Sequence, residues 1–274
     1  MKLSMYTCHA RNMIPPDFSL ALRHYHNLGV TGGVFLQSEL KEIPFDRYCD
    51  YLQEAELDLD GFVSTCNIAS FDEAVRSQQF DLLKKQIDQA ANRALPLVMI
   101  APAVEAAKNA EELHQMREHM VSAYNRIIEY ARGSNIRITV ENYSLPTRAD
   151  SRISDLRYLF DQVPELGFVL DTGNFHCVHE DARQAYEILG DRIVQIHCKD
   201  WIYDEGGWLK RDGLPMINGV TLGEGFIPLF EILERAAREK PEITMVLEDN
   251  SNNLTREGLD RSVEFLKQFT KGGI

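Results

Sequence analysis

The segment IRITVEN, at residues 136–142, is a short run rich in β-branched residues that stops at a glutamate and an asparagine. Three later segments have the same form: GFVLDTGNF at 167–175, RIVQIHCKD at 192–200 and ITMVLEDN at 243–250. Short apolar runs bounded by polar residues are typical of buried parallel strands. These segments therefore predict four strands, each ending in a side chain that can do chemistry.

The same pattern extends outward to the whole chain. Strands are predicted at 3–6, 32–36, 59–64, 97–100, 136–140, 167–170, 193–196 and 243–247. Amphipathic stretches with apolar residues every three or four positions predict helices at 71–91, 110–130, 153–162 and 226–238. Eight strands interleaved with helices predict the α/β class, as a single (β/α)8 TIM barrel that forms one domain over 1–274.

An open, doubly wound sheet is the main alternative to a closed barrel. Such sheets usually have fewer strands and often an early glycine-rich phosphate loop. The sequence contains neither GxGxxG nor GxxxxGK[ST], so the barrel is the better prediction.

Composition narrows the possible partners and location. The formal net charge is −13 and the basic residues are scattered, whereas a nucleic-acid binder gathers them on one face. No apolar run approaches the roughly 18 residues of a membrane helix, and the first apolar stretch is too short for a signal peptide. The five cysteines, odd in number and without a CxxC pair, suit a reducing compartment. We therefore expect a cytoplasmic protein that binds neither nucleic acid nor membranes.

The last four strands each end in a residue that can bind a metal. These residues are Glu141, Asp171, His197 and Glu248. Barrel active sites form where strands end, so the four side chains should converge on one mouth. Carboxylates with one imidazole suit a single divalent ion, Mn²⁺ first, with Mg²⁺, Co²⁺ and Zn²⁺ as alternatives. Any one of them alone could be a helix cap or a structural residue, but converging carboxylates repel one another without a cation.

Further polar residues near the strand ends are candidates for binding a substrate. They are Tyr6, His9, Asn174, His176 and Lys199. Lys199 could reach a substrate oxygen, or form a salt bridge with Asp171 or Asp200. For Tyr6 and His9 simple packing is the alternative, and for His176 a helix-capping or surface role. The long irregular stretch at 200–225 follows the seventh strand and so belongs to the catalytic face.

The sequence resembles the xylose-isomerase-like superfamily of sugar phosphate isomerases and epimerases. This superfamily includes ketose 3-epimerases, inosose isomerases and dehydratases, and endonuclease-IV-like enzymes. The resemblance spans nearly the whole chain and rests on VEN at 140–142, LDTGNF at 170–175, IHCKD at 196–200, LGEG at 222–225 and LEDN at 247–250. It implies that Glu141, Asp171, His197 and Glu248 bind the metal, and that the two glutamates also transfer protons.

The implied activity is a metal-dependent isomerisation or epimerisation of a small polyhydroxylated ketone or aldehyde. A ketose or an inosose, with or without a phosphate, would react through an enediolate that the metal stabilises. A lyase or dehydratase acting on a keto-sugar, an inosose or a dehydroshikimate-like acid is the alternative, since it would use the same residues. A barrel that binds a sugar or a partner without catalysis is a third hypothesis. The resemblance also implies a homodimer or homotetramer.

Two departures from the family pattern bear on specificity. Many of the epimerases carry a histidine three positions after the aspartate ligand, where this chain has Asn174, with His176 two residues later. This argues against ketose 3-epimerase activity in particular. The endonuclease-IV-like enzymes use extra histidine and aspartate ligands, and neither Ser64-Thr65-Cys66 nor Ala101-Pro102-Ala103 supplies a histidine.

Overall fold

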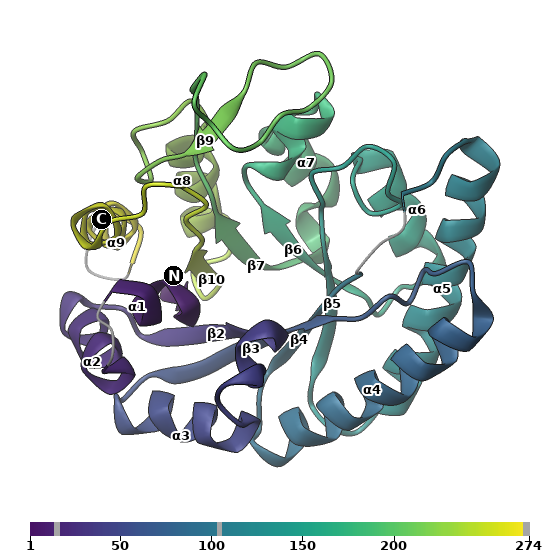
Figure 1. The fold of residues 1–274 in the computed structure, drawn as a ribbon, viewed down its shortest axis with the longest axis horizontal. Coiled ribbons are helices and arrows are strands. Elements are labelled where there is room, and N and C mark those ends of the chain that lie inside the picture. Colours follow the sequence, from purple (N-terminus) through teal and green to yellow (C-terminus); the bar gives the residue numbers. More distant parts are fainter. Residues whose placement is uncertain (14–16, 103–105, 271–274) are drawn as a thin grey trace.

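The computed structural model describes residues 1–13, 17–102 and 106–270. Within these residues, eight parallel strands close into a barrel in the order β1-β10-β7-β6-β5-β4-β3-β2 (Figure 1). The strands are β1 (Lys2–Tyr6), β2 (Gly32–Leu36), β3 (Asp58–Thr65), β4 (Leu97–Ala101), β5 (Arg137–Glu141), β6 (Gly167–Asp171), β7 (Ile193–Cys198) and β10 (Thr244–Leu247). All eight predicted strands, and the predicted barrel, are confirmed.

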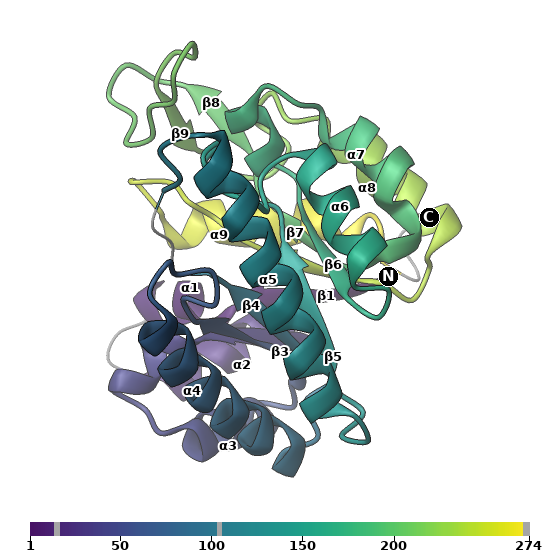
Figure 2. The same cartoon turned by 90° about the vertical axis from the view of Figure 1, so that its right-hand side faces the viewer.

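Helices surround the strands on the outside, as the two perpendicular views show (Figures 1 and 2). They are α1 (Thr7–Met13), α2 (Phe18–Leu28), α3 (Phe45–Glu54), α4 (Glu73–Asn92), α5 (Ala110–Ala131), α6 (Ile153–Gln162), α7 (Ala182–Leu189), α8 (Leu229–Glu239) and α9 (Arg256–Lys267). Short 3₁₀ helices are η1 (Gln37–Lys41), η2 (Asn174–Val178) and η3 (Gly190–Arg192). Among the helices that the structure describes, none combines the length and apolar composition needed to cross a bilayer.

The predicted helices at 71–91, 110–130, 153–162 and 226–238 correspond to α4, α5, α6 and α8. Only α8 starts clearly later than predicted, at Leu229 instead of residue 226. Pro228 stands at its N-cap, and a proline disfavours helical backbone in the residue before it. The first turn therefore cannot extend back through Ile227.

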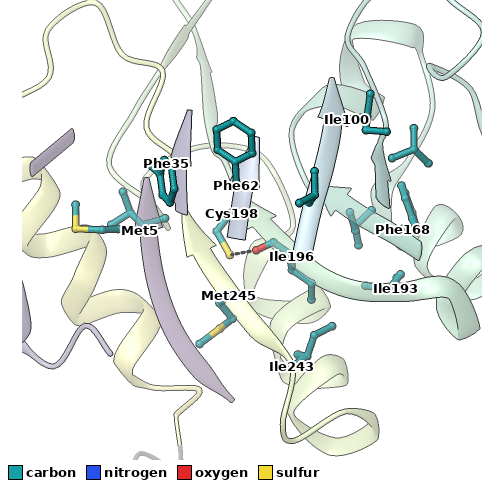
Figure 3. Packing of buried hydrophobic residues seen from close by; sticks show 14 of the residues in the cluster. Met5, Phe35, Phe62, Ile100, Phe168, Ile193, Ile196, Cys198, Ile243 and Met245 are labelled. Atoms are coloured by element: carbon teal, nitrogen blue, oxygen red, sulfur yellow. Dashed lines mark hydrogen bonds between the residues drawn. The ribbon is translucent and has the colours of Figure 1, made fainter. Parts of the chain in front are cut away.

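Side chains alternate between two apolar layers along each strand, as the pleat requires. Met5, Phe35, Phe62, Ile196 and Cys198 belong to the large cluster between strands and helices (Figure 3). A smaller cluster fills the barrel interior, and it contains Tyr6, Val34, Val63, Leu97, Met99, Val169 and Val246. Glu141 and His197 follow the interior positions of their strands, so both side chains point into the barrel mouth.

The stretch at 200–225 is more ordered than predicted. It contains a two-stranded antiparallel ribbon, β8 (Trp201–Tyr203) paired with β9 (Ile217–Gly219). The Asp200 carboxylate closes the base of this segment by accepting hydrogen bonds from the amides of Gly223, Gly225 and Ile227 at 2.9–3.1 Å. A Cβ atom on Gly225 would lie 2.1 Å from Asp200 Oδ1, so only glycine allows this approach.

Candidate metal centre

Three of the predicted ligands meet at the carboxyl ends of the barrel strands. Glu141 is the last residue of β5, His197 lies near the end of β7, and Glu248 directly follows β10. One ligand atom from each lies within 4.8 Å of the other two. The His197 side chain is fully buried, whereas those of Glu141 and Glu248 are 13% and 14% exposed. The three side chains therefore form a compact cluster whose open side faces the barrel mouth.

The ring of His197 presents Nδ1 to the two carboxylates. This nitrogen lies 2.5 Å from Glu141 Oε1 and 3.5 Å from Glu248 Oε2, with the Tyr6 hydroxyl at 3.1 Å. Burial disfavours the imidazolium, but the charges of Glu141 and Glu248 outweigh burial and raise the pKa of His197 to about 9. The cluster thus attracts a cation at this position, which can be a proton or a metal ion.

Asp171 lies beside this cluster and is held by other partners. Its Oδ1 accepts hydrogen bonds from the amides of Gly173 and Asn174 at 2.8 and 2.7 Å, at the start of η2. Its Oδ2 forms an ion pair with Lys199 Nζ at 2.7 Å. Burial raises the pKa of Asp171 to about 7, although Lys199 acts in the opposite direction. The structure therefore brings three of the four predicted ligands together and pairs the fourth with a lysine.

Lys199 links Asp171 to the cluster, because its ammonium also lies 2.9 Å from Glu248 Oε1. Burial alone would lower the pKa of Lys199, but the charges of Asp171 and Glu248 outweigh burial and raise the pKa above its usual value. The ammonium therefore stays charged. In turn, Lys199 and His197 hold the pKa of Glu248 well below its usual range, despite burial. Of the two salt bridges considered for Lys199, the one to Asp171 is present, while the Asp200 carboxylate binds backbone amides.

One carboxylate oxygen in this cluster is suited to a metal ion. Glu248 Oε2 is buried and makes no hydrogen bond of good geometry, with His197 Nδ1 as its neighbour at 3.5 Å. Buried acceptors without donors are rare in native structures and call for an explanation. Together with His197 Nδ1 and the Glu141 carboxylate, it forms a mixed oxygen and nitrogen donor set that suits Mn²⁺ or Zn²⁺. The residues present therefore fit a divalent ion.

Two of the predicted substrate-binding residues, Tyr6 and Asn174, contact His197 and Lys199 at the candidate centre. Tyr6 touches His197, and the amide of Asn174 is held between the carbonyl of Asn142 and Lys199 Nζ, at 2.9 and 3.4 Å. Burial raises the pKa of Tyr6 well above its usual value, so its hydroxyl keeps its proton.

His9 accepts a hydrogen bond from the amide of Asp249 at 3.0 Å, and thereby anchors the loop that begins with Glu248. His176 is placed differently. Its ring packs against Phe226 and Tyr203, with ring centroids 4.6 and 6.0 Å apart, and its contacts do not reach the carboxylate cluster. A direct role for His176 in binding substrate therefore has no support from its position.

Two residues that the prediction missed hold two of the predicted ligands in place. Asn142 extends the pairing of β5 with β6, since its side chain donates to Asp171 O and accepts from Asp171 N at 3.0 and 2.8 Å. Gln195 faces the other ring nitrogen of His197 at 3.1 Å. The sequence did carry a signal for Gln195. It lies two positions before His197 on the same strand, and residues two apart on a strand share a face.

Comparisons with known proteins agree with this architecture. A family model described as xylose isomerase-like TIM barrel matches residues 27–269. A sugar phosphate isomerase/epimerase from Parabacteroides distasonis is similar in structure, with a TM-score of 0.74, 15% identity, and 98% of this chain and 97% of the other covered. A probable 3-DHS dehydratase from Bacillus anthracis, AsbF, has a TM-score of 0.72 at 14% identity, covering 99% and 100%.

The third similar structure is the IOLI protein with a bound zinc atom, with a TM-score of 0.74, 16% identity, and 98% and 96% covered. Identities this low establish the shared fold and leave the activity open. No curated protein sequence matches the chain closely enough to count as a relative. Because the family model covers most of the chain, the protein belongs to the xylose isomerase-like TIM barrel family.

Proposed function

We propose that this protein is a divalent-metal-dependent isomerase or epimerase of a small polyhydroxylated ketone or aldehyde, such as a ketose or an inosose. One observation carries the proposal: the Nδ1 atom of a buried histidine and two glutamate carboxylates converge at the catalytic end of the barrel. The sugar phosphate isomerase/epimerase and the zinc-containing IOLI protein among the similar structures lend further support.

Glu141, His197 and Glu248 would hold the ion, which we expect to be Mn²⁺, with Zn²⁺, Co²⁺ or Mg²⁺ as alternatives. Asp171 remains the predicted fourth ligand, and it could join them only if Lys199 moved aside. When bound, such an ion polarises a substrate carbonyl and the neighbouring hydroxyl, which acidifies the adjacent carbon–hydrogen bond.

The two glutamates would move the proton. Glu248, which Lys199 keeps ionised, would accept a proton from the substrate carbon, and the lowered pKa that Lys199 imposes limits its basicity. Glu141 comes from β5, which lies on the other side of β7 from β10 in the barrel order, and would return a proton to the neighbouring carbon, or to the opposite face of the same carbon. The Lys199 ammonium and the Tyr6 hydroxyl would donate hydrogen bonds to the negative oxygens of the enediolate.

A dehydratase is the second candidate, and Lys199 is the observation that favours it. A buried ammonium at the edge of the cluster can donate a hydrogen bond to a departing hydroxyl group and offset its negative charge. The probable dehydratase among the similar structures matches this chain over 99% of its length. Mass spectrometry of the products separates the two candidates, because elimination removes one water and isomerisation leaves the mass unchanged.

The test is a screen of ketoses, inososes and dehydroshikimate-like acids in the presence of Mn²⁺. Wild type should turn over at least one of them, and Glu141→Gln and Glu248→Gln should each lose at least about a hundredfold in rate, as expected for a proton-transfer group. Glu224→Gln is the matched control, since Glu224 is half-exposed and pairs with Arg261 at the surface. Turnover that survives both active-site changes would disprove the assignment.

A small sugar-like substrate, cytoplasmic location and assembly as a homodimer or homotetramer remain proposals. Several large apolar side chains are about half-exposed, among them Leu20, Ile188 and Phe230. Sedimentation velocity would give the oligomeric state, and a purely monomeric protein would contradict the expected assembly.

A further inference from the structure

Gln195 lies directly beneath the candidate metal centre, inside the barrel. Ile196 and Cys198 point outward into the layer between strands and helices (Figure 3), so Gln195 and His197 point inward. The Gln195 side chain is buried, with 2% exposure. Its Oε1 lies 3.1 Å from His197 Nε2, and its Nε2 donates to the backbone carbonyl of Asp60 at 3.4 Å.

The Asp60 carbonyl is available because β2 and β3 slip out of register at this point. Gly33 pairs with Leu59 and Val34 pairs with Gly61, so Asp60 is the extra residue of a β-bulge. Such a residue is left out of the ladder, and its backbone groups can bind elsewhere. The bulge thus supplies a fixed acceptor inside the barrel, opposite Gln195.

This acceptor determines how the hydrogen bonds run toward His197. A carbonyl oxygen only accepts, so the Gln195 group that faces Asp60 must be the NH₂ group. The amide oxygen then faces His197 and also only accepts, so Nε2 of His197 must carry a hydrogen. In the neutral imidazole the other nitrogen, Nδ1, consequently keeps its lone pair and directs it at Glu141 and Glu248.

The opposite tautomer would otherwise be favoured. A hydrogen on Nδ1 would find the Glu141 carboxylate at 2.5 Å and the Glu248 carboxylate at 3.5 Å, and it would block the nitrogen that faces the cluster. An outer hydrogen-bond partner that fixes the ring commonly changes metal affinity by a factor of about 10–100.

We propose that Gln195 is a positioning residue that selects Nδ1 of His197 as the metal-binding nitrogen, with the bulge at Asp60 fixing the orientation of its amide. The inference rests on the proposed metal site and extends it to the interior of the barrel. It assigns a role to a residue that touches neither the substrate nor the ion.

The test compares Mn²⁺ affinity, measured by calorimetry, in wild type and Gln195→Met. Methionine keeps the volume and removes the acceptor, so the dissociation constant should rise about 10- to 100-fold. Gln86→Met is the matched control. Gln86 is equally buried, at 4% exposure, but on α4 it accepts a hydrogen bond from Ser64 instead of orienting a ligand. The Mn²⁺ affinity of the Gln86→Met variant should stay at the wild-type value.

Gln195→Glu, as the neutral acid, keeps an acceptor for His197 Nε2 and an O–H donor for the Asp60 carbonyl. It should therefore retain close to wild-type affinity, which protects the test against a Met variant that merely folds poorly. In Zn²⁺-loaded protein, nitrogen–proton NMR should show a slowly exchanging Nε2–H of His197 in wild type and in Gln195→Glu. Tight binding by Gln195→Met, or a Glu variant as weak as the Met variant, would overturn the inference alone. A wild type that binds no metal would overturn the proposed function as well.

Discussion

Metal affinity should rise steeply with pH, because the ion and a proton compete for the same nitrogen of His197. Without metal, burial disfavours the imidazolium, but Glu141 and Glu248 outweigh it and raise the pKa of His197 to about 9. Coordination requires the Nδ1 lone pair, so binding below that pH releases a proton. The apparent dissociation constant for Mn²⁺ should therefore fall about tenfold per pH unit, or about 30-fold between about pH 7 and pH 8.5.

Protonation of Asp171 could change the same dependence of Mn²⁺ affinity on pH. Burial raises its pKa to about 7 although Lys199 opposes the shift. If Asp171 stays paired with Lys199, binding of each metal ion should release one proton both below and above about pH 7. If Asp171 coordinates as well, a second proton should be released below that pH, and the slope should steepen there.

Calorimetry in buffers of different ionisation enthalpy gives both the affinity and the number of protons released at each pH. His24→Gln is the matched control, because His24 lies in a partly buried pair with Asp260, away from the cluster, and its loss should leave the slope unchanged. A dissociation constant that does not vary across this pH range, with no proton released, would refute the assignment of His197 Nδ1 as a ligand.

Three further changes test neighbouring parts of the structure. Lys199→Met leaves two buried carboxylates without their cation and should destabilise the metal-free protein by about 3–5 kcal/mol in urea unfolding, whereas Lys267→Met, in an exposed pair, should cost less than about 1 kcal/mol. Asp171→Asn should weaken Mn²⁺ binding less than Glu141→Gln does in the same calorimetric assay, and an equal loss would show that Asp171 coordinates. Gly225→Ala puts a Cβ 2.1 Å from a carboxylate oxygen and should destabilise by about 2 kcal/mol or more, and unchanged stability would contradict the close approach.

The barrel could be predicted because each strand has a strong local signal. Short runs such as 167–170 and 193–196 are mainly apolar and are stopped by a polar side chain, so both the strand and its polar end are visible in the sequence. Parallel pairing then places the carboxyl ends of neighbouring strands together, which explains why Glu141, His197 and Glu248 meet.

Features that depend on side-chain direction could not be predicted in this way. Asp171 ends its strand as expected, but the turn through Gly173 directs two amides at one carboxylate oxygen, and Lys199 binds the other. His176 lies in the 3₁₀ helix that follows, where its ring packs on Phe226. The ribbon of β8 and β9 pairs residues about sixteen positions apart, and no local sequence pattern at 200–225 predicts this contact.

If the cluster around His197 binds one divalent metal ion, the metal content of the purified protein will show it. Purified wild type and His197→Ala would be loaded with Mn²⁺, dialysed together and analysed by mass spectrometry of the metal. We expect one equivalent in wild type and a loss of the ion in the variant. A wild type that retains no metal, or a variant that retains as much as wild type, would show that His197 does not hold a metal ion.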